Sequence, residues 1–237
     1  MTYKSIFVAA TGQHVGKTTS TLGLTSVLSR RGYNVGYCKP VGQKFVELGN
    51  LRVDKDALLF ADLLDFNLVP EIHSPVLLGR GSTKAYLDNP IQDELRRRID
   101  FAHEKLSEKY DVVVYEGTGH PGVGSIADVS NAQVAKRLGS EVVLVIEGGI
   151  GSTIDKLNLS TSLFTLHGVK ISGVIINKVR IDKMEEVRHY VGNYLKSQNL
   201  PLLGLLPYDK TLAYPVMKTI AGAIQGTVTH HAERLGN

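Results

Sequence analysis

Residues 5–19, which read SIFVAATGQHVGKTT, decide the fold of this chain. The first part is a short apolar run whose length and composition predict a buried strand over Ser5–Ala10. From Lys17 the sequence favours a helix, predicted over Lys17–Arg31 and ended by Gly32. Between the two lies Gly16-Lys17-Thr18, and a Gly-Lys-Thr sequence that joins a strand to a helix is typical of a phosphate-binding loop.

The loop that leads into Lys17 can bind a polyphosphate for direct physical reasons. Its backbone N–H groups can surround the phosphates, and the new helix presents its positive dipole end to them. Lys17 can reach the β- and γ-phosphates, and the Thr18 hydroxyl can bind Mg²⁺. The common pattern has a glycine five residues before Gly16, where this chain has Thr11 and places its glycine one residue later. The predicted nucleotide-binding residues of the loop are Gly12, Gln13, His14, Val15, Gly16, Lys17, Thr18 and Thr19.

Apolar runs of strand length alternate with helical stretches along the rest of the chain. Further strands are predicted over Asn34–Cys38, Asp111–Tyr115, Glu141–Ile146, Ile171–Ile176 and Leu202–Leu206. Helices are predicted over Asp54–Leu64, Pro90–Lys109, Asn131–Leu138, Thr153–Leu166 and Lys183–Ser197, and a last one is predicted to start near Pro215. Strands that are apolar throughout are covered on both faces. We therefore expect an α/β fold of P-loop NTPase type, with a doubly wound, mostly parallel sheet and helices on both faces. The stretch Asn67–Asn89 is predicted to be irregular.

Composition excludes several classes of protein. With 43% hydrophobic and 21% charged residues the chain can form a core, and we expect one domain over residues 1–237. A single cysteine, Cys38, excludes an intramolecular disulfide framework and a cysteine-rich zinc site, and this count fits a reducing cytoplasm. Cys38 is predicted to be a buried core thiol. The start of the sequence does not resemble a signal peptide, and no apolar run is long enough to span a bilayer. The net charge of +4 is mild, and the basic run Arg96–Arg98 is flanked by acidic residues. We therefore expect neither a nucleic-acid nor a membrane partner.

Two further glycine-rich loops follow predicted strands. The segment EGTGHPGVGS begins at Glu116, directly after Asp111–Tyr115. A carboxylate at the end of such a strand is the usual second anchor for Mg²⁺ in phosphate-loop proteins, so Glu116 is predicted to be a metal-binding or catalytic carboxylate. His120 either contacts substrate or caps the loop. The segment EGGIGST begins at Glu147, and its Gly151 either belongs to a tight turn or lines the site.

These motifs together resemble dethiobiotin synthetase over most of the chain. The resemblance rests on Gly-Lys-Thr after the first strand, Lys39-Pro40-Val41 after the second, Asp56-Ala57, the segment Glu116–Gly119, and two later features. The later features are Asn177 after a strand and LGLLP over Leu203–Pro207. Related families include cobyrinic acid a,c-diamide synthase and the dethiobiotin-synthetase-like N-terminal domain of some phosphotransacetylases.

The resemblance implies roles for individual residues. ATP and Mg²⁺ would be the cofactors, and the γ-phosphoryl group would pass to a carboxylate or carbamate before ring closure or amide formation. The implied catalytic residues are Lys17, Lys39 and Glu116. The implied metal ligands are Thr18, Asp56 and Glu116. Asn177 would read the adenine, and Pro207 with the two residues after it is expected to border the base. The substrate would meet Lys39, Gly119, His120 and Gly151. The family also implies a homodimer.

The sequence also departs from true dethiobiotin synthetases. The residue before Val-Gly-Lys-Thr is His14 instead of an acid, and Gln43 stands in the segment after Lys39-Pro40-Val41 where the family has a small hydroxyl residue and a glycine. The loops at Glu116 and Glu147 look closer to the phosphotransacetylase N-terminal domain. A second hypothesis is therefore a nucleotide-sensing regulatory domain without catalysis. In relatives the C-terminal region can run into another domain, and a continuation of this chain into such a domain would favour the second hypothesis.

Three other interpretations are weaker. ATPases of the partition and septum-site class carry an extra lysine five residues before Lys17, where this chain has Gly12. A GTPase would require Asn-Lys-x-Asp, but Asn177-Lys178 is followed by Val179 and Arg180. Cobyrinate synthases need a glutaminase domain with a nucleophilic cysteine, for which this sequence has no room. An amide product would therefore require ammonia or a separate amine.

Overall fold

The computed structural model describes residues 5–49, 51–79, 81–213, 226–227 and 229. Its centre is a six-stranded sheet with the order β10-β9-β8-β1-β7-β2, in which all neighbouring strands run parallel. The strands are β1 (Ser5–Ala10), β2 (Val35–Cys38), β7 (Val112–Glu116), β8 (Glu141–Glu147), β9 (Ile171–Val179) and β10 (Leu202–Pro207). The predicted parallel sheet is confirmed.

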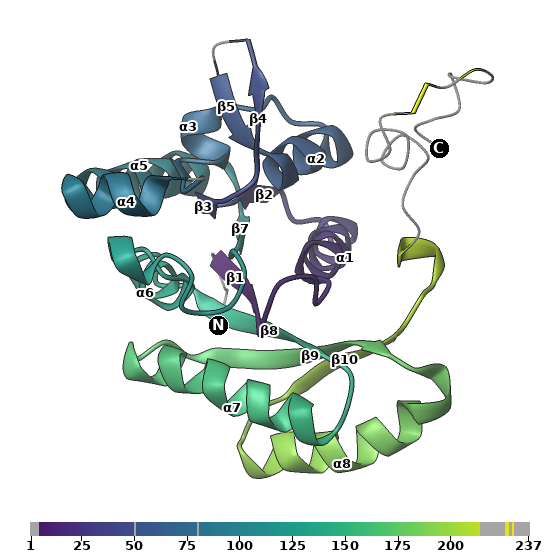
Figure 1. Cartoon of the computed structure of the whole chain (residues 1–237). Helices are drawn as coiled ribbons and strands as arrows, with labels where there is room; N and C mark the ends of the chain where they lie inside the picture. Colours follow the sequence, from purple (N-terminus) through teal and green to yellow (C-terminus); the bar gives the residue numbers. More distant parts are fainter. Residues whose placement is uncertain (1–4, 50, 80, 214–225, 228, 230–237) are drawn as a thin grey trace.

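Helices cover both faces of this sheet, as Figure 1 shows for α1 and α6 on opposite sides of β1. The long helices are α1 (Lys17–Arg30), α2 (Lys55–Leu64), α5 (Gln92–Lys109), α7 (Gly151–Leu166) and α8 (Met184–Ser197), and α6 (Asn131–Arg137) is shorter. Alternate residues of β1 point to opposite faces of the sheet. Phe7 and Ala9 belong to the core under α5–α8, whereas Val8 and Ala10 pack with Leu24 and Leu28 of α1. Burial on both faces explains why β1, β7 and β8 are apolar at nearly every position.

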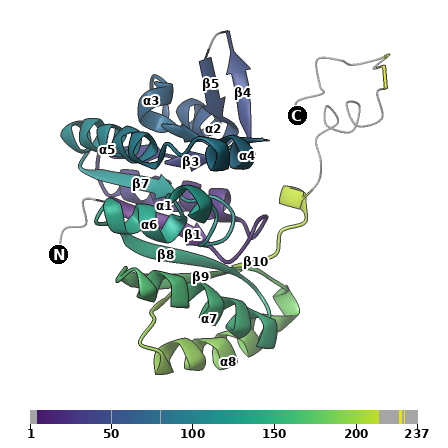
Figure 2. The same cartoon turned by 60° about the vertical axis from the view of Figure 1, so that its left-hand side comes forward.

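The region between β2 and α5 contains structure that the sequence analysis missed. A hairpin is formed by β4 (Phe45–Leu48) and β5 (Leu51–Asp54), and β3 (Val41–Gly42) pairs with β6 (Val76–Leu77). The stretch predicted to be irregular also holds two short helices, α3 (Pro70–His73) and α4 (Ser82–Asp88). Figure 2 shows the hairpin at the end of the molecule opposite α8. Strands of two to four residues and helices of four to seven residues carry little periodic hydrophobic signal.

Most other boundaries differ from the predictions by one or two residues. The helix predicted from Asp54 begins at Lys55, because the Asp54 side chain accepts a hydrogen bond from the Asp56 N–H and so caps the helix. The helix predicted from Pro90 begins at Gln92, and the one predicted from Thr153 begins at Gly151. The helix predicted near Pro215 lies outside the described residues. Cys38 is buried, as predicted.

The fold brings four chain segments to one edge of the sheet. The phosphate loop follows β1, Lys39 follows β2, Glu116 ends β7, and Asn177 lies near the end of β9. In an open α/β sheet the carboxyl ends of the strands form the usual ligand crevice. Within the described part of the chain, no helix is long and apolar enough to cross a bilayer.

Candidate functional site

The phosphate loop has the backbone geometry that an anion site requires. Gly16, which precedes α1, has φ 94°, and no side chain in the described part of the chain caps the free N–H groups of this helix end. A Cβ atom on Gly16 would lie 1.9 Å from the Nδ2 atom of Asn177, so only glycine fits. The loop therefore leaves backbone donors available at the positive end of α1.

A cavity of about 440 Å³ opens beside this loop. Eleven of the residues predicted for the site line it: Gln13, His14, Gly16, Lys17, Thr18, Thr19, Lys39, Asp56, Gly119, Asn177 and Pro207. Five predicted residues are not in its lining: Gly12, Val15, Glu116, His120 and Gly151. The volume is in the range of small-molecule sites.

Glu116 is absent from the cavity lining, and none of its surface is exposed. Its Oε1 accepts a hydrogen bond of 2.7 Å from the Thr18 hydroxyl, and its Oε2 accepts one of 3.2 Å from the Tyr37 hydroxyl. The Lys39 ammonium lies 3.5 Å from Oε1. Burial raises the pKa of Glu116, and Lys39 and Lys17 oppose that shift. Glu116 thus joins the phosphate loop to the segment after β2.

Lys39 lies among three carboxylates. Its Nζ contacts Asp56 and Glu116, and is 3.7 Å from Oδ1 of Asp54. Burial acts to lower the pKa of Lys39, but the three carboxylates more than offset this effect, and the pKa lies above its usual range. Lys39 therefore stays charged at neutral pH, which suits it to electrostatic stabilisation of anions and not to proton abstraction.

The pKa of Lys17 is shifted in the opposite direction to that of Lys39. Burial lowers the pKa of Lys17, with Glu116 opposing and Lys39 adding to the shift. Two lysines and three carboxylates therefore share one small volume beside the phosphate loop. Clusters of strongly perturbed charges are commonest at functional sites.

Three oxygen-bearing side chains of this region, those of Thr18, Asp56 and Glu116, are of the kind that binds Mg²⁺. Among the described residues, no group of three His, Cys, Asp or Glu side chains could hold a metal ion by itself. Mg²⁺ instead usually takes one or two carboxylates, a hydroxyl and the oxygens of a bound phosphate. Thr18 Oγ1 and Glu116 Oε1 are already 2.7 Å apart, and Asp56 meets the same ammonium as Glu116. The donor set of Thr18, Asp56 and Glu116 fits Mg²⁺ bound together with a nucleotide.

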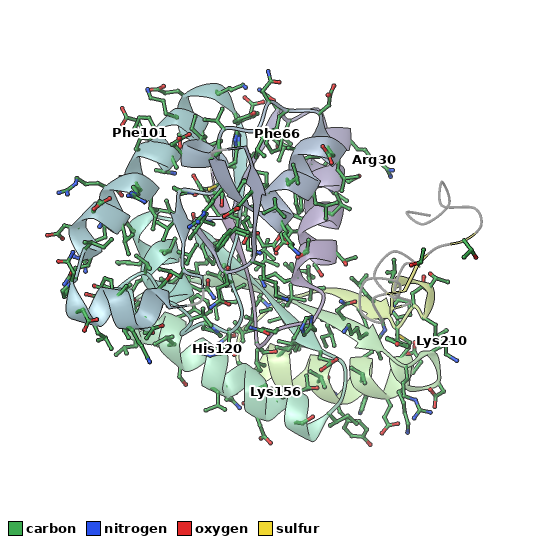
Figure 3. The ribbon with its side chains drawn as sticks, turned by 45° about the horizontal axis from the view of Figure 1, so that its top comes forward. Arg30, Phe66, Phe101, His120, Lys156 and Lys210 are labelled. Carbon is green, nitrogen blue, oxygen red and sulfur yellow. The ribbon has the colours of Figure 1, made fainter. Side chains whose placement is uncertain are left out.

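The loop after β7 is held by an asparagine. Asn131, at the start of α6, accepts from the Thr118 N–H at 2.9 Å and donates to the carbonyls of Thr118 and His120 at 2.8 Å each. This arrangement places Gly119 in the cavity wall, but the His120 side chain is exposed. Figure 3 shows His120 well separated from Lys210. Lys210 is the residue after Asp209, which lines the cavity, whereas His120 does not line it.

Sequence analysis did not assign several residues that line the cavity: Lys44, Asp54, Lys55, Thr118, Lys178 and Leu212. Asp54 carried a signal, since it stands two residues before Asp56 at the start of a predicted helix. Lys178 carried one as the neighbour of Asn177. The two lysines at 44 and 55 flank the hairpin that was not predicted, so nothing in the sequence pattern could place them here.

Comparison with known proteins shows the family to which the chain belongs. A family described as AAA domain matches residues 4–216. The ATP-dependent dethiobiotin synthetase of Clostridium kluyveri is 31% identical over 219 residues, covering 88% of this chain and 88% of that protein. The phosphate acetyltransferase of Nitrosomonas europaea is 27% identical over 238 residues, which cover 95% of this chain. This chain spans 32% of that protein's length.

Solved structures support the fold. The septum site-determining protein MinD from Pyrococcus horikoshii, crystallised with Mg-ADP, superposes with a TM-score of 0.54 at 18% identity, covering 89% of this chain and 83% of that one. At this identity the likeness concerns the fold alone. The family match covers most of the sequence, and the relative from Clostridium kluyveri matches along most of its own length. The chain therefore belongs to the AAA-domain family of P-loop proteins that includes the ATP-dependent dethiobiotin synthetases.

Proposed function

We propose that this protein is an ATP- and Mg²⁺-dependent ligase that transfers the γ-phosphoryl group of ATP to a carboxylate or carbamate before ring closure or amide formation. The observation that carries the proposal is the Lys39 ammonium held among Asp54, Asp56 and Glu116, next to Thr18 of the phosphate loop. Nucleotide binding at a regulatory site requires only a phosphate loop. A second buried cation, Lys39, would in addition stabilise the negative charge of an acceptor, so its presence favours phosphoryl transfer.

The residues divide the work as follows. Lys17 and the loop N–H groups bind the polyphosphate, and Thr18, Asp56 and Glu116 would hold Mg²⁺, which neutralises phosphate charge when bound. An acceptor oxygen attacks the γ-phosphorus, the bond to the β–γ bridging oxygen breaks, and ADP leaves. Lys39 stabilises the negative charge of the acceptor and of the transferring group. An amine then displaces phosphate from the resulting anhydride.

The acceptor side of the site is also part of the proposal. Gly119 lies in the cavity wall beside Lys39, and we assign His120 and Gly151 to a more distant part of the substrate or to a second copy of the chain. Lys44 and Lys55 are exposed at the cavity and favour an anionic acceptor. We further propose that the protein is a cytoplasmic homodimer with one domain per chain. Sedimentation analysis would test the oligomeric state.

The test is ADP release measured with Mg·ATP and a set of acceptors: diaminopelargonate with bicarbonate, and simple carboxylates with ammonia. The expected result is acceptor-stimulated ADP release that disappears in Lys39→Met and requires Mg²⁺. Lys196→Met, an exposed lysine on α8 away from the cavity, is the matched control and should retain full activity. Absence of stimulation by every acceptor would contradict the ligase proposal.

A second candidate function is a nucleotide-sensing regulatory domain. It is favoured by the match to the phosphate acetyltransferase of Nitrosomonas europaea, in which a region equivalent to this chain makes up a third of a larger protein. This candidate predicts ATP binding that depends on Lys17, with no acceptor-stimulated turnover. The ADP-release assay therefore separates the two candidates, whereas ATP binding alone does not. Unchanged ATP affinity in Lys17→Ala would exclude both.

A further inference from the structure

Two neighbouring residues of β9 donate hydrogen bonds to the phosphate loop. Nδ2 of Asn177 donates to the carbonyl of Val15 at 2.9 Å, and Nζ of Lys178 donates to the carbonyl of His14. Asn177 is buried and Lys178 half-buried, and both line the cavity. Consecutive carbonyls of the loop are thus held by consecutive side chains of a strand 162 and 164 residues away in sequence.

The loop needs such support because part of its backbone is strained. His14 has φ 58°, in the left-handed region that residues with a Cβ rarely adopt. Lys178 itself has φ 57°. Such conformations persist only where the surrounding structure holds them. The hydrogen bonds from β9 act directly at His14 and at the residue after it, so they are placed to hold this conformation.

The direction of the carbonyls matters for anion binding. A carbonyl oxygen that faces a phosphate repels it, whereas an N–H group that faces it donates a hydrogen bond. The carbonyls of His14 and Val15 are engaged by Lys178 and Asn177, so they cannot turn toward the phosphates. Close packing reinforces the arrangement, because Asn177 occupies the space where a Cβ on Gly16 would stand.

We propose that Asn177 and Lys178 are positioning residues that hold the phosphate loop in its polyphosphate-binding conformation. Asn177 then acts on triphosphate affinity through the loop, whereas the resemblance to dethiobiotin synthetase implies that it reads the adenine. Lys178 also lies 3.9 Å from Glu147, which orients its ammonium. The inference rests on the ATP binding of the proposed function but not on its ligase chemistry.

Inorganic tripolyphosphate separates the two roles, because it has the phosphates of ATP and no base. Calorimetry with tripolyphosphate, ATP and GTP would compare the wild-type protein with Asn177→Ala. The expected result is that the dissociation constants for ATP and tripolyphosphate rise by the same factor, roughly five- to tenfold for one buried hydrogen bond, with the ATP-to-GTP preference unchanged. Tripolyphosphate binding that stays at the wild-type level while ATP binding weakens would overturn the proposal.

Lys178 needs a readout that direct attraction to phosphate would not change. In ligand-free Lys178→Met, the NMR order parameters of the backbone N–H bonds of residues 13–16 should fall below those of the wild-type protein, and Lys178→Arg should restore them. Lys44→Met is the matched control: it removes another cavity lysine whose side chain makes no hydrogen bond to the loop among the described residues. Its loop order parameters should equal those of the wild-type protein.

The outcomes distinguish failure of this inference from failure of the proposed function. A wild-type protein that binds neither ATP nor tripolyphosphate contradicts both. A protein that binds both ligands, but whose loop order parameters are unchanged in Lys178→Met, contradicts the positioning role alone. Thermal unfolding of each variant checks that the fold is intact. If Asn177→Ala does not fold, the two Lys178 variants still decide the matter.

Discussion

Replacing Glu116 by alanine and by glutamine would separate its contribution to folding from its contribution to metal binding. Alanine removes the acceptor of the Thr18 and Tyr37 hydroxyl groups and one of the anions around Lys39. Glutamine keeps nearly the same volume and an acceptor oxygen but has no charge. The two variants should therefore differ in stability and agree in their loss of Mg²⁺ binding.

The stability effect can be estimated from the contacts. Removing one partner of a buried ion pair costs about 3–5 kcal/mol. Lys39 keeps Asp54 and Asp56, and the change also relieves the burial of the Glu116 charge, so we expect about 1–3 kcal/mol for Glu116→Ala. For a chain of this size that lowers Tm by roughly 2–12 °C. Glu116→Gln should cost about 1 kcal/mol or less, because its amide oxygen can still accept from one hydroxyl group while its NH₂ group donates to the other.

The assay combines thermal unfolding with ATP binding measured at increasing Mg²⁺ concentration. If Glu116 is a metal ligand, both variants should need at least about 100-fold more Mg²⁺ to tighten ATP binding, since changes one shell further out already cost 10–100-fold. Two results would refute the reasoning. If Glu116→Gln retains the wild-type Mg²⁺ dependence, Glu116 binds no metal. If Glu116→Gln is as unstable as Glu116→Ala, the charge of Glu116 supports the fold and its hydrogen bonds do not.

Three further predictions follow from buried groups near the site. Lys39→Met should abolish acceptor-stimulated ADP release and lower Tm, because it removes the ammonium that contacts the buried carboxylates of Asp54 and Glu116; unchanged ADP release would exclude a role in transfer. Gly42→Ala should lower the free energy of unfolding by about 1–3 kcal/mol, because its Cβ would lie 2.4 Å from Oδ2 of Asp54. Gly23→Ala in α1 meets nothing within 4 Å and should be neutral or stabilising, and equal effects at the two glycines would contradict the steric argument. Burial lowers the pKa of His73 from 6.5 to about 4, so only the unfolded chain takes up this proton as the pH falls from 6.5. Its stabilising contribution is complete above pH 6.5 and is lost toward pH 4, and urea unfolding of His73→Gln should show a flatter pH dependence over this interval than the wild-type protein.

The elements that could be predicted are those with a long, repeated signal. β1, β7 and β8 are apolar at nearly every position because helices cover both faces of the sheet, and α5 repeats Leu95, Ile99, Ala102 and Leu106 on its buried face. The hairpin of β4 and β5 was missed because its strands lie apart from the central sheet and have four residues each. Local pattern carries little information at that length.

In the candidate site, too, local features could be predicted from the sequence and long-range contacts could not. Residues adjacent to a strand end could be assigned from the sequence: Lys17 and Thr18 after β1, Lys39 after β2, and Glu116 at the end of β7. Their mutual contacts could not, because Lys39 and Glu116 are 77 positions apart and only β2–β7 pairing brings them together. The contact of Lys178 with the His14 carbonyl depends in the same way on the neighbouring strands β1, β8 and β9.

By itself, the sequence determined that a phosphate loop joins the first strand to the first helix, that the sheet is parallel, and that acidic and basic residues end its strands. These properties are local: they follow from hydrophobic periodicity and from the order of residues within one loop. Tertiary structure alone decided which distant side chains and loops are in contact: Lys39 contacts Asp54, Asp56 and Glu116, and Asn177 contacts the phosphate loop. Contacts between distant segments depend on strand order and on the packing of side chains in three dimensions, and the periodicity of a single segment contains neither.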